Sequence, residues 1–330
     1  MKKIINAVDQ VEEQMIEGIA KTYPQYLRRV EGATAVVRAQ KKEGKVVLVS
    51  GGGSGHEPAH AGFVGAGMLD GAVFGAVFTS PTPDQVYAAI EDVATDEGVL
   101  LIIKNYTGDV MNFEMAADMA RDMGYNVDQV VVNDDVAVDG SLFTVGRRGV
   151  AGTVFVHKVA GAKAETGASL EEVKAVAQKA IDNVRTMSMA IRPCTVPAAG
   201  KPGFELGEDE MEIGIGIHGE PGTHREPLKT ADEIVDMLLD KILADLDYAG
   251  HEVAVMINGC GATPLMELYI ASNHVSDVLA EKGISVARTY VGEFVTSLEM
   301  EGFSISLLRL DDELKELLFA PADTPAFKEL

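Results

Sequence analysis

Short apolar runs alternate with amphipathic stretches along the first half of the chain. Residues 7–22 have helical periodicity and end before Pro24, which predicts an N-terminal helix. Four apolar runs, each followed by polar or helical sequence, predict strands: "KVVLV" (45–49), "AVFGAVF" (72–78), "GVLLII" (98–103) and "NVDQVVV" (126–132). Uninterrupted apolar strands that alternate with helices are typical of a parallel sheet whose two faces are both covered.

The pattern changes after a predicted helix at Ser169–Val184. An irregular segment, "CTVPAAGKPGFELGEDE" (194–210), separates this helix from the rest of the chain, so we predict a domain boundary between residues 185 and 186. Beyond it we expect a helix over 230–246, the strand "EVAVMIN" (252–258), a helix over 263–283 and strands near 284–291 and 302–309. The sequence therefore predicts an α/β protein. We expect residues 1–185 to form a mostly parallel sheet with helices on both faces, and residues 186–330 to form an α+β domain.

Composition narrows the class of function. The chain has 51 acidic and 28 basic residues and a net charge of −23, which disfavours nucleic acid and anionic membranes as partners. No signal peptide or membrane-spanning segment is expected from the sequence. Cys194 and Cys260 are the only cysteines and make no disulfide framework, so we expect a cytoplasmic location.

Three polar segments follow predicted strands directly. They are Gly51–His56, Thr79–Pro83 and Asn105–Asp109. Ligands of parallel sheets bind beyond the carboxyl ends of the strands, where these segments meet. We therefore expect the functional site at this edge of the first sheet.

The glycine-rich segment "SGGGSGHEPAH" (50–60) resembles two known motifs but fits neither. A phosphate-binding P-loop requires Lys-Ser/Thr where this chain has His56-Glu57. The "HEPAH" string matches the H-E-x-x-H pattern of zinc proteases, yet a helix could only begin here, with Pro58 in its first turn. We expect no metal site, and we expect His60 to be a helix-packing residue.

Two further candidates are open to different interpretations. "GIGIHG" (214–219) is followed by Pro221 and predicts a strand packed closely against other backbone, with His218 at its end. Such a histidine is more often structural. Asp109, five residues after Lys104, is either a partner in an exposed ion pair or a general base for a hydroxyl proton.

Other charged residues have a weaker signal. Asp134, Asp135 and Asp139 are metal-ligand types, but no spacing of further ligands supports a metal. Arg147 and Arg148 suit either an anion or a neighbouring carboxylate.

Several long strings occur together and in order: "SGGGSGHEPAH", "FTSPTPDQ", "IIKNYTGDVMNFE", "DDVAV", "GRRGVAGT", "CTVPAAGKP", "GIHGEPG" and "GATPLMELY". With them the chain resembles the K-subunit family of dihydroxyacetone kinases along nearly its whole length. The family has single-chain members with their own ATP-binding helical domain, and split members that depend on the phosphotransferase system. Without such a helical extension, this chain resembles the separate K subunit.

The resemblance implies roles for particular residues. His218 would attack the ketone carbon of dihydroxyacetone and form a covalent hemiaminal. His56 and Asp109 would handle protons and position the hydroxyl that becomes phosphorylated. The substrate-binding set that the resemblance implies is Gly53, Ser54, Gly55, His56, Lys104 and Asp109.

The resemblance also implies partners. This chain would bind no cofactor, because a nucleotide-binding L subunit would bring ADP or ATP with Mg²⁺, and an M subunit of the phosphotransferase system would supply phosphate. Members of the family are homodimers. A dihydroxyacetone-sensing transcriptional co-activator is the alternative, although the presence of His56, Asp109 and Lys104 beside His218 favours catalysis. "RTMSMAIRP" (185–193) departs from the small apolar residues usual in relatives, which leaves the role of Arg192 and Pro193 open.

Overall fold

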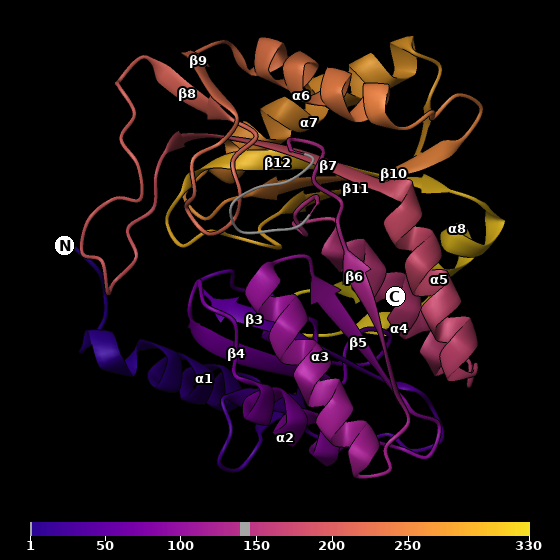
Figure 1. Cartoon of the computed structure of the whole chain (residues 1–330). Helices are drawn as coiled ribbons and strands as arrows, with labels where there is room; N and C mark the ends of the chain where they lie inside the picture. Colours follow the sequence, from indigo (N-terminus) through magenta and orange to yellow (C-terminus); the bar gives the residue numbers. More distant parts are fainter. Residues whose placement is uncertain (1, 139–145) are drawn as a thin grey trace.

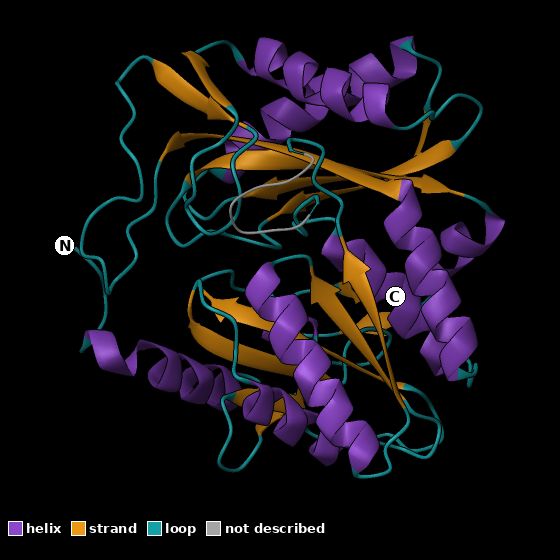
Figure 2. Cartoon of the chain, viewed as in Figure 1, coloured by secondary structure: helices purple, strands orange, loops and turns teal. Residues whose placement is uncertain are grey.

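Two six-stranded sheets lie one above the other in the computed structural model, which describes residues 2–138 and 146–330 (Figures 1 and 2). The strands of the first sheet follow the spatial order β1 (Leu27–Arg29), β2 (Ala35–Arg38), β4 (Gly71–Val77), β3 (Val47–Ser54), β5 (Val99–Lys104) and β6 (Val127–Val132). Strands β4, β3, β5 and β6 run parallel, whereas β1 and β2 are antiparallel to their neighbours. The prediction of a mostly parallel sheet is therefore confirmed.

Helices cover both faces of this sheet. Alternation along β5 sends Leu101 and Ile103 to one face, where they pack against α2 (Pro83–Val93) and α3 (Thr107–Asp122). Leu100 and Ile102 face α4 (Thr153–Glu165) and α5 (Leu170–Asn183) on the other side. The N-terminal segment forms η1 (Val8–Gln10) and α1 (Val11–Thr22), as the 7–22 periodicity predicts.

The second sheet is mixed and has helices of its own. Its order is β11 (Ser285–Gly292), β10 (Glu252–Gly259), β12 (Glu301–Leu310), β7 (Val184–Arg192), β8 (Glu210–Ile213) and β9 (His224–Pro227), with only β10 and β11 parallel. Its outer face packs on α6 (Ala231–Asp245) and α7 (Leu265–Glu281). The short α8 (Asp312–Phe319), β13 (Ala322–Asp323) and β14 (Lys328–Glu329) complete the chain.

The two halves share packing. Met256 of β10 and Leu308 of β12 belong to the same apolar cluster as Phe155 of α4. The C-terminal segment also returns to the first half, where the Asp323 N–H donates to the Ala66 carbonyl at 2.9 Å. A division of the chain at residues 185 and 186 remains our proposal.

Three local predictions are wrong. The glycines at 51–53 lie within strand β3 and not in a loop, because it pairs with β4 as far as Ser54. No α-helix forms around Pro58, and only the 3-10 turn η2 (Ala61–Phe63) follows. Strand β8 ends at Ile213, so the segment 214–219 is irregular. Within residues 2–138 and 146–330, no helix has the length and apolar character needed to cross a bilayer.

Candidate functional site

Glycines in β3 let other groups approach the strand closely. A Cβ on Gly51 would lie 2.4 Å from the Val73 carbonyl oxygen, and one on Gly52 would lie 2.7 Å from Lys104 Nζ. Gly52 also has a φ of 151°, which side chains rarely allow. The glycines therefore make room for the neighbouring strand and for the Lys104 ammonium at one edge of the sheet.

His56 follows this strand and is fixed by one hydrogen bond and by one stacked ring. Its Nδ1 donates to the Thr296 carbonyl at 2.8 Å, which leaves Nε2 without its proton. The Phe78 ring stacks on the imidazole at 5.1 Å and 19°. Burial, with the nearby Lys104 ammonium as a second cause, lowers the pKa of His56 to about 3. His56 is thus a neutral base whose Nε2 is available.

His218 stands beside His56, although 162 positions separate them in the sequence. The two rings meet edge-on at 4.8 Å, and Tyr106 packs on His218 at 4.3 Å. Burial lowers the pKa of His218 well below its usual range, with smaller contributions from His56 and Lys104. A neutral imidazole has a free nitrogen lone pair, so His218 is a competent nucleophile.

A buried arginine fixes the segment that carries His218. Glu220 accepts from the His218 N–H at 2.8 Å and pairs with Arg148 at 3.3 Å. Arg148 also contacts Asp135 at 2.6 Å and donates to the Gly214 carbonyl at 2.7 Å. Of the two interpretations of Arg148, the structure supports a neighbouring carboxylate. Arg147 similarly pairs with Asp245 at 2.6 Å.

Lys104 and Asp109 lie close to Gly52 of strand β3. Lys104 Nζ donates to the Gly51 carbonyl at 3.0 Å and contacts His60 Nε2 at 2.7 Å. Asp109 lies in the first turn of α3, not in an exposed loop, and is almost fully buried. Burial raises the pKa of its carboxyl, while the Lys104 ammonium opposes that effect. This arrangement suits a carboxylate that exchanges a proton with a ligand.

A cavity of about 680 Å³ is lined by His218 and Asp109, whereas His56 and Lys104 are not among its lining residues. Its lining includes Phe78, Ser80, Tyr106, Gly108, Asp109, Asn112, His218 and Glu220. Three buried polar atoms beside it have no hydrogen-bond partner within the described part of the chain: His56 Nε2, Tyr106 Oη and Asp109 Oδ1. Because buried polar atoms are normally paired, this group indicates a place for a polar ligand.

The remaining members of the predicted binding set lie next to this cavity without lining it. Ser54 donates its hydroxyl to the Gly75 carbonyl at 2.7 Å. A Cβ on Gly53 would lie 2.5 Å from the Thr79 nitrogen, and one on Gly55 would lie 2.8 Å from the Phe78 ring. The roles of Gly53, Ser54 and Gly55 in binding stay a prediction.

His60 packs against His157 of helix α4, although His60 does not itself lie in an α-helix. An ammonium group can only donate, so Lys104 leaves the proton of His60 on Nδ1, which lies 2.9 Å from His157 Nε2. The sequence gave no sign of His157, because it lies in an apolar helix about 100 residues later. The sequence pattern does not single out Tyr106 or Phe78 either, although Tyr106 lies within the segment Asn105–Asp109 and Phe78 directly precedes Thr79–Pro83.

No metal centre is evident in residues 2–138 and 146–330, where no group of three or more ligand-type side chains gathers. Asp134 instead accepts from the N–H groups of Val150 and Gly152, both at 2.8 Å. Asp135 is occupied by Arg148. Asp139 lies outside the described residues.

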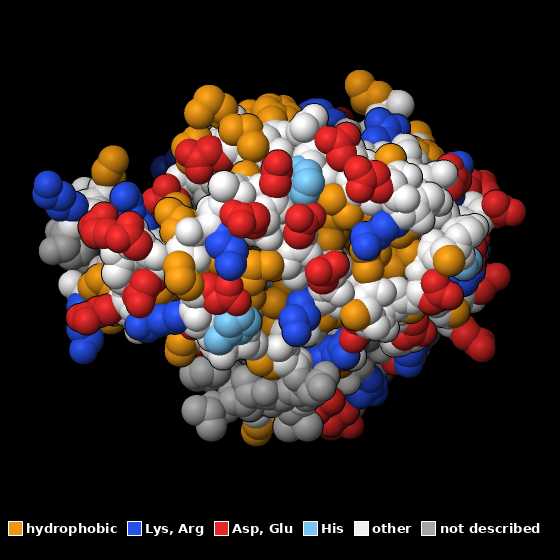
Figure 3. All heavy atoms as spheres, turned by 90° about the horizontal axis from the view of Figure 1, so that it is seen from above, with side chains coloured by type: hydrophobic (Ala, Val, Ile, Leu, Met, Phe, Trp, Pro, Cys, Tyr) orange, Lys and Arg blue, Asp and Glu red, His pale blue; other side chains and the backbone are white. Residues whose placement is uncertain are grey.

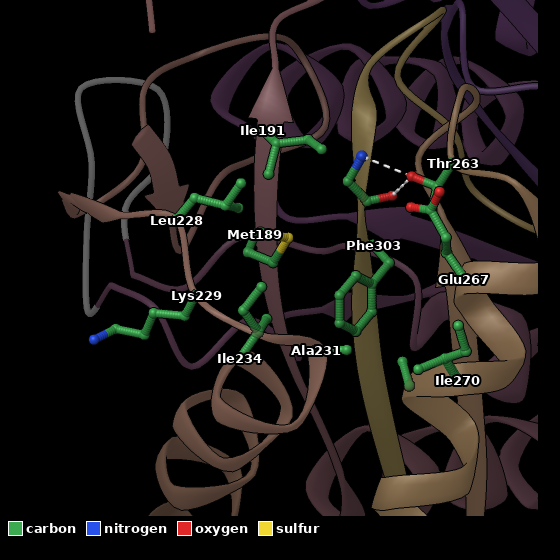
Figure 4. Close-up of a pocket in the computed structure, with 12 residues that line it drawn as sticks. Met189, Ile191, Leu228, Lys229, Ala231, Ile234, Thr263, Glu267, Ile270 and Phe303 are labelled. Atoms are coloured by element: carbon green, nitrogen blue, oxygen red, sulfur yellow. Dashed lines mark hydrogen bonds between the residues drawn. The ribbon is translucent and has the colours of Figure 1, made fainter. Parts of the chain in front are cut away.

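A second, smaller cavity lies on the outer face of the second sheet (Figure 4). It measures about 250 Å³ and is lined chiefly by apolar side chains, including Met189, Ile234, Ile270 and Phe303. Seen from that side, hydrophobic side chains gather between acidic and basic ones (Figure 3). This cavity has no convergent polar atoms comparable with those of the first.

Comparisons with known proteins agree with one another. The family model described as the Dak1 domain matches residues 17–326. A Listeria innocua protein, "PTS-dependent dihydroxyacetone kinase 1, dihydroxyacetone-binding subunit DhaK", is 56% identical over 99% of this chain and 100% of its own length.

Two solved structures have the same fold. One is "Dihydroxyacetone kinase operon co-activator Dha-DhaQ", with a TM-score of 0.92, 37% identity and coverage of 98% and 99% of the two chains. The other is the dihydroxyacetone kinase from C. freundii in complex with AMP-PNP and Mg²⁺. It has a TM-score of 0.92 and 36% identity, and the match covers 99% of this chain but 61% of that one.

Proposed function

The chain belongs to the Dak1-domain family as a dihydroxyacetone kinase subunit, and from this premise we propose that it binds dihydroxyacetone covalently through His218. It then presents a terminal hydroxyl of the sugar for phosphorylation by a partner. One observation carries this proposal. The neutral His218 lies at the cavity together with three buried polar atoms that have no hydrogen-bond partner among the described residues, namely His56 Nε2, Tyr106 Oη and Asp109 Oδ1.

Covalent attachment solves a selectivity problem. A three-carbon ketose offers too few atoms for selective binding by weak contacts, and glycerol has nearly the same shape. Only the ketone reacts with an imidazole nitrogen. The nitrogen lone pair forms a bond to the carbonyl carbon, the carbonyl oxygen takes up a proton, and the ring loses one. The resulting hemiaminal also fixes the terminal hydroxyl in place.

Charge and hydrogen bonding support the roles that we propose for the other residues. His56 Nε2, a neutral base at 4.8 Å ring separation from His218, would exchange the protons of the addition step. Asp109 would accept the proton of the hydroxyl that attacks phosphorus. Lys104, with Gly53, Ser54 and Gly55 of the glycine segment, would hold the sugar's oxygens.

The phosphoryl group comes from elsewhere in this proposal. Phosphoryl transfer depends on alignment and on charge stabilisation by metal ions and cationic groups. We propose that an L subunit brings ADP or ATP with Mg²⁺, that an M subunit of the phosphotransferase system supplies phosphate, and that the K chain works as a homodimer in the cytoplasm. The Listeria relative, whose name states dependence on that system, supports the split arrangement.

A sensing role remains the second candidate. The co-activator structure is as similar to this chain as the kinase structure, at a TM-score of 0.92 for both. Sensing would need only the covalent adduct. The buried Asp109 beside Lys104 favours catalysis, because a base for the hydroxyl serves transfer and not binding.

A crystal soak and a reconstituted assay test the proposal. We expect continuous density between a ring nitrogen of His218 and the central carbon of dihydroxyacetone, and no such density with glycerol. With the L and M subunits and phosphoenolpyruvate-derived phosphate, the wild-type chain should form dihydroxyacetone phosphate. Ketone bound without a link to His218 would contradict the covalent mechanism, and adduct without turnover would support the sensing role.

A further inference from the structure

Four exposed methionines form a row along α3. Met111, Met115, Met119 and Met123 are 57%, 55%, 40% and 67% exposed. A spacing of four residues keeps successive side chains on neighbouring positions of one helix face. The opposite face of α3 carries Phe113, which is fully buried against the sheet. A continuous apolar row on the outer face of a helix is unusual for a surface that only meets water.

The methionine row begins at the rim of the ligand cavity. Gly108, Asp109 and Asn112, from the first turns of α3, line that cavity, and Met111 lies within the same turns. In Figure 1, α3 lies in front of the first sheet with its N-terminal end toward the second sheet. A protein seated on the methionine row would therefore also reach the mouth of the cavity.

Acidic residues flank the methionine row. Glu114, Asp118 and Asp122 are exposed on the same side of α3, each four residues from the next. Asp118 pairs with Arg121 at 2.8 Å, and the whole chain is strongly acidic. The complementary surface is an apolar patch with basic residues at its border, since like charges facing each other would oppose association.

We propose that the methionine row on α3 is the docking surface for the nucleotide-carrying subunit, an inference that rests on the proposed function. A donor phosphate must reach the hydroxyl held between His218 and Asp109, so its carrier must cover the rim formed by the start of α3. Methionine side chains are flexible and adapt to a partner. This suits a contact that forms and dissociates as the partner is recharged with phosphate.

The outer face of the second sheet supplies a matched comparison. Met266, on α7, is 69% exposed and lies beside exposed Leu265 and Tyr269. This patch adjoins the smaller cavity of Figure 4 and faces away from the first sheet. A substitution there changes an exposed methionine without touching the rim of the ligand cavity.

The test compares Met111→Glu/Met115→Glu with Met266→Glu. Affinity for the L subunit loaded with MgADP is measured by calorimetry, and the initial rate is measured as the L subunit is varied. We expect the α3 double variant to bind roughly 100-fold more weakly, at about tenfold for each contact residue lost from an interface. Met266→Glu should bind as wild type does. Met111→Leu/Met115→Leu, which keeps an apolar row, should lose less than about threefold.

Several readouts separate the possible failures. The dihydroxyacetone adduct is measured on each isolated chain, so failure of the wild type to form it would contradict the proposed function while the affinity data still decide the docking surface. Unchanged affinity of the α3 double variant would overturn the docking proposal. Dissociation of a K-chain dimer by this variant, seen in sedimentation, would overturn it too by assigning the row to a second copy.

Discussion

The imidazole rings of His56 and His218 meet edge-on, with centroids 4.8 Å apart and ring planes at 77°. Burial lowers the pKa of both rings, and the nearby Lys104 ammonium lowers it further. One ring is fixed by Thr296 and the other by the Arg148-bound segment that follows Gly214. This contact joins the two halves of the sequence at the functional site.

His218→Ala should remove the covalent adduct and leave a pocket that still admits three-carbon polyols. We expect binding of dihydroxyacetone to weaken to about the level of glycerol, because shape alone hardly separates the two compounds. Competition measured by calorimetry checks this. Retained preference for the ketone would show that His218 is not the attachment point.

Asp109→Asn should separate binding from chemistry. The amide keeps the size of the side chain, so the adduct should still form, while turnover with the partner subunits should fall by roughly 10²–10⁴-fold, as for loss of a general base. Mass spectrometry and a coupled assay measure the two effects. Near-normal turnover would refute the role of Asp109.

Stability should fall as the pH drops below about 6.5. Burial lowers the pKa of His56 and that of His157 to about 3 in the folded chain, whereas unfolded histidine titrates near 6.5. The unfolded state therefore binds more protons between about pH 6.5 and 3, and the stability that is fully present above 6.5 is lost as pH falls. Each such histidine contributes a slope of up to about 1.4 kcal/mol per pH unit.

The variant His157→Gln tests that cause. Glutamine can still accept from His60 Nδ1, but it does not titrate. Urea unfolding between pH 5 and 6.5 should show a shallower decline of the unfolding free energy for the variant than for wild type. Equal slopes would mean that His157 is not protonated on unfolding in this range.

Arg148→Ala should be strongly destabilising, by about 3–5 kcal/mol, because it leaves Asp135 and Glu220 buried without their cation. If the variant folds, its adduct should also be weaker, since Glu220 holds the His218 N–H. Denaturant unfolding and calorimetry measure both effects.

Arg192→Ala is the matched surface control. Its guanidinium is largely exposed and pairs with Glu301 at 3.3 Å. We expect a change within about 0.5 kcal/mol. A comparable loss of stability in the two variants would contradict the prediction that the buried Arg148 contributes more to stability than the exposed Arg192. Arg192, whose role the sequence leaves open, thus has an ion pair at the surface.

Apolar periodicity predicted most of the fold. Runs such as Val99–Ile103 are buried on both faces, which happens in few settings besides a covered parallel sheet, and the structure confirms it. The sequence does not predict strands β1, β2, β7 and β9; the four residues of β9 are polar and largely exposed. The sequence predicts a loop at 51–53 where the structure has strand β3, because glycine has no side chain whose polarity would indicate a strand.

The sequence by itself determined the class of fold and singled out His56, Lys104, Asp109 and His218 as candidate site residues, because strand ends and motif strings are local properties. Only the tertiary structure decided that His218 meets His56, that Arg148 fixes its segment and that His60 joins Lys104 to His157. It also decided the neutral state of the two site histidines. These features depend on burial and on contacts between segments that lie far apart in the sequence. A local pattern of residues therefore cannot predict them, because another part of the chain supplies both the low dielectric and the neighbouring group.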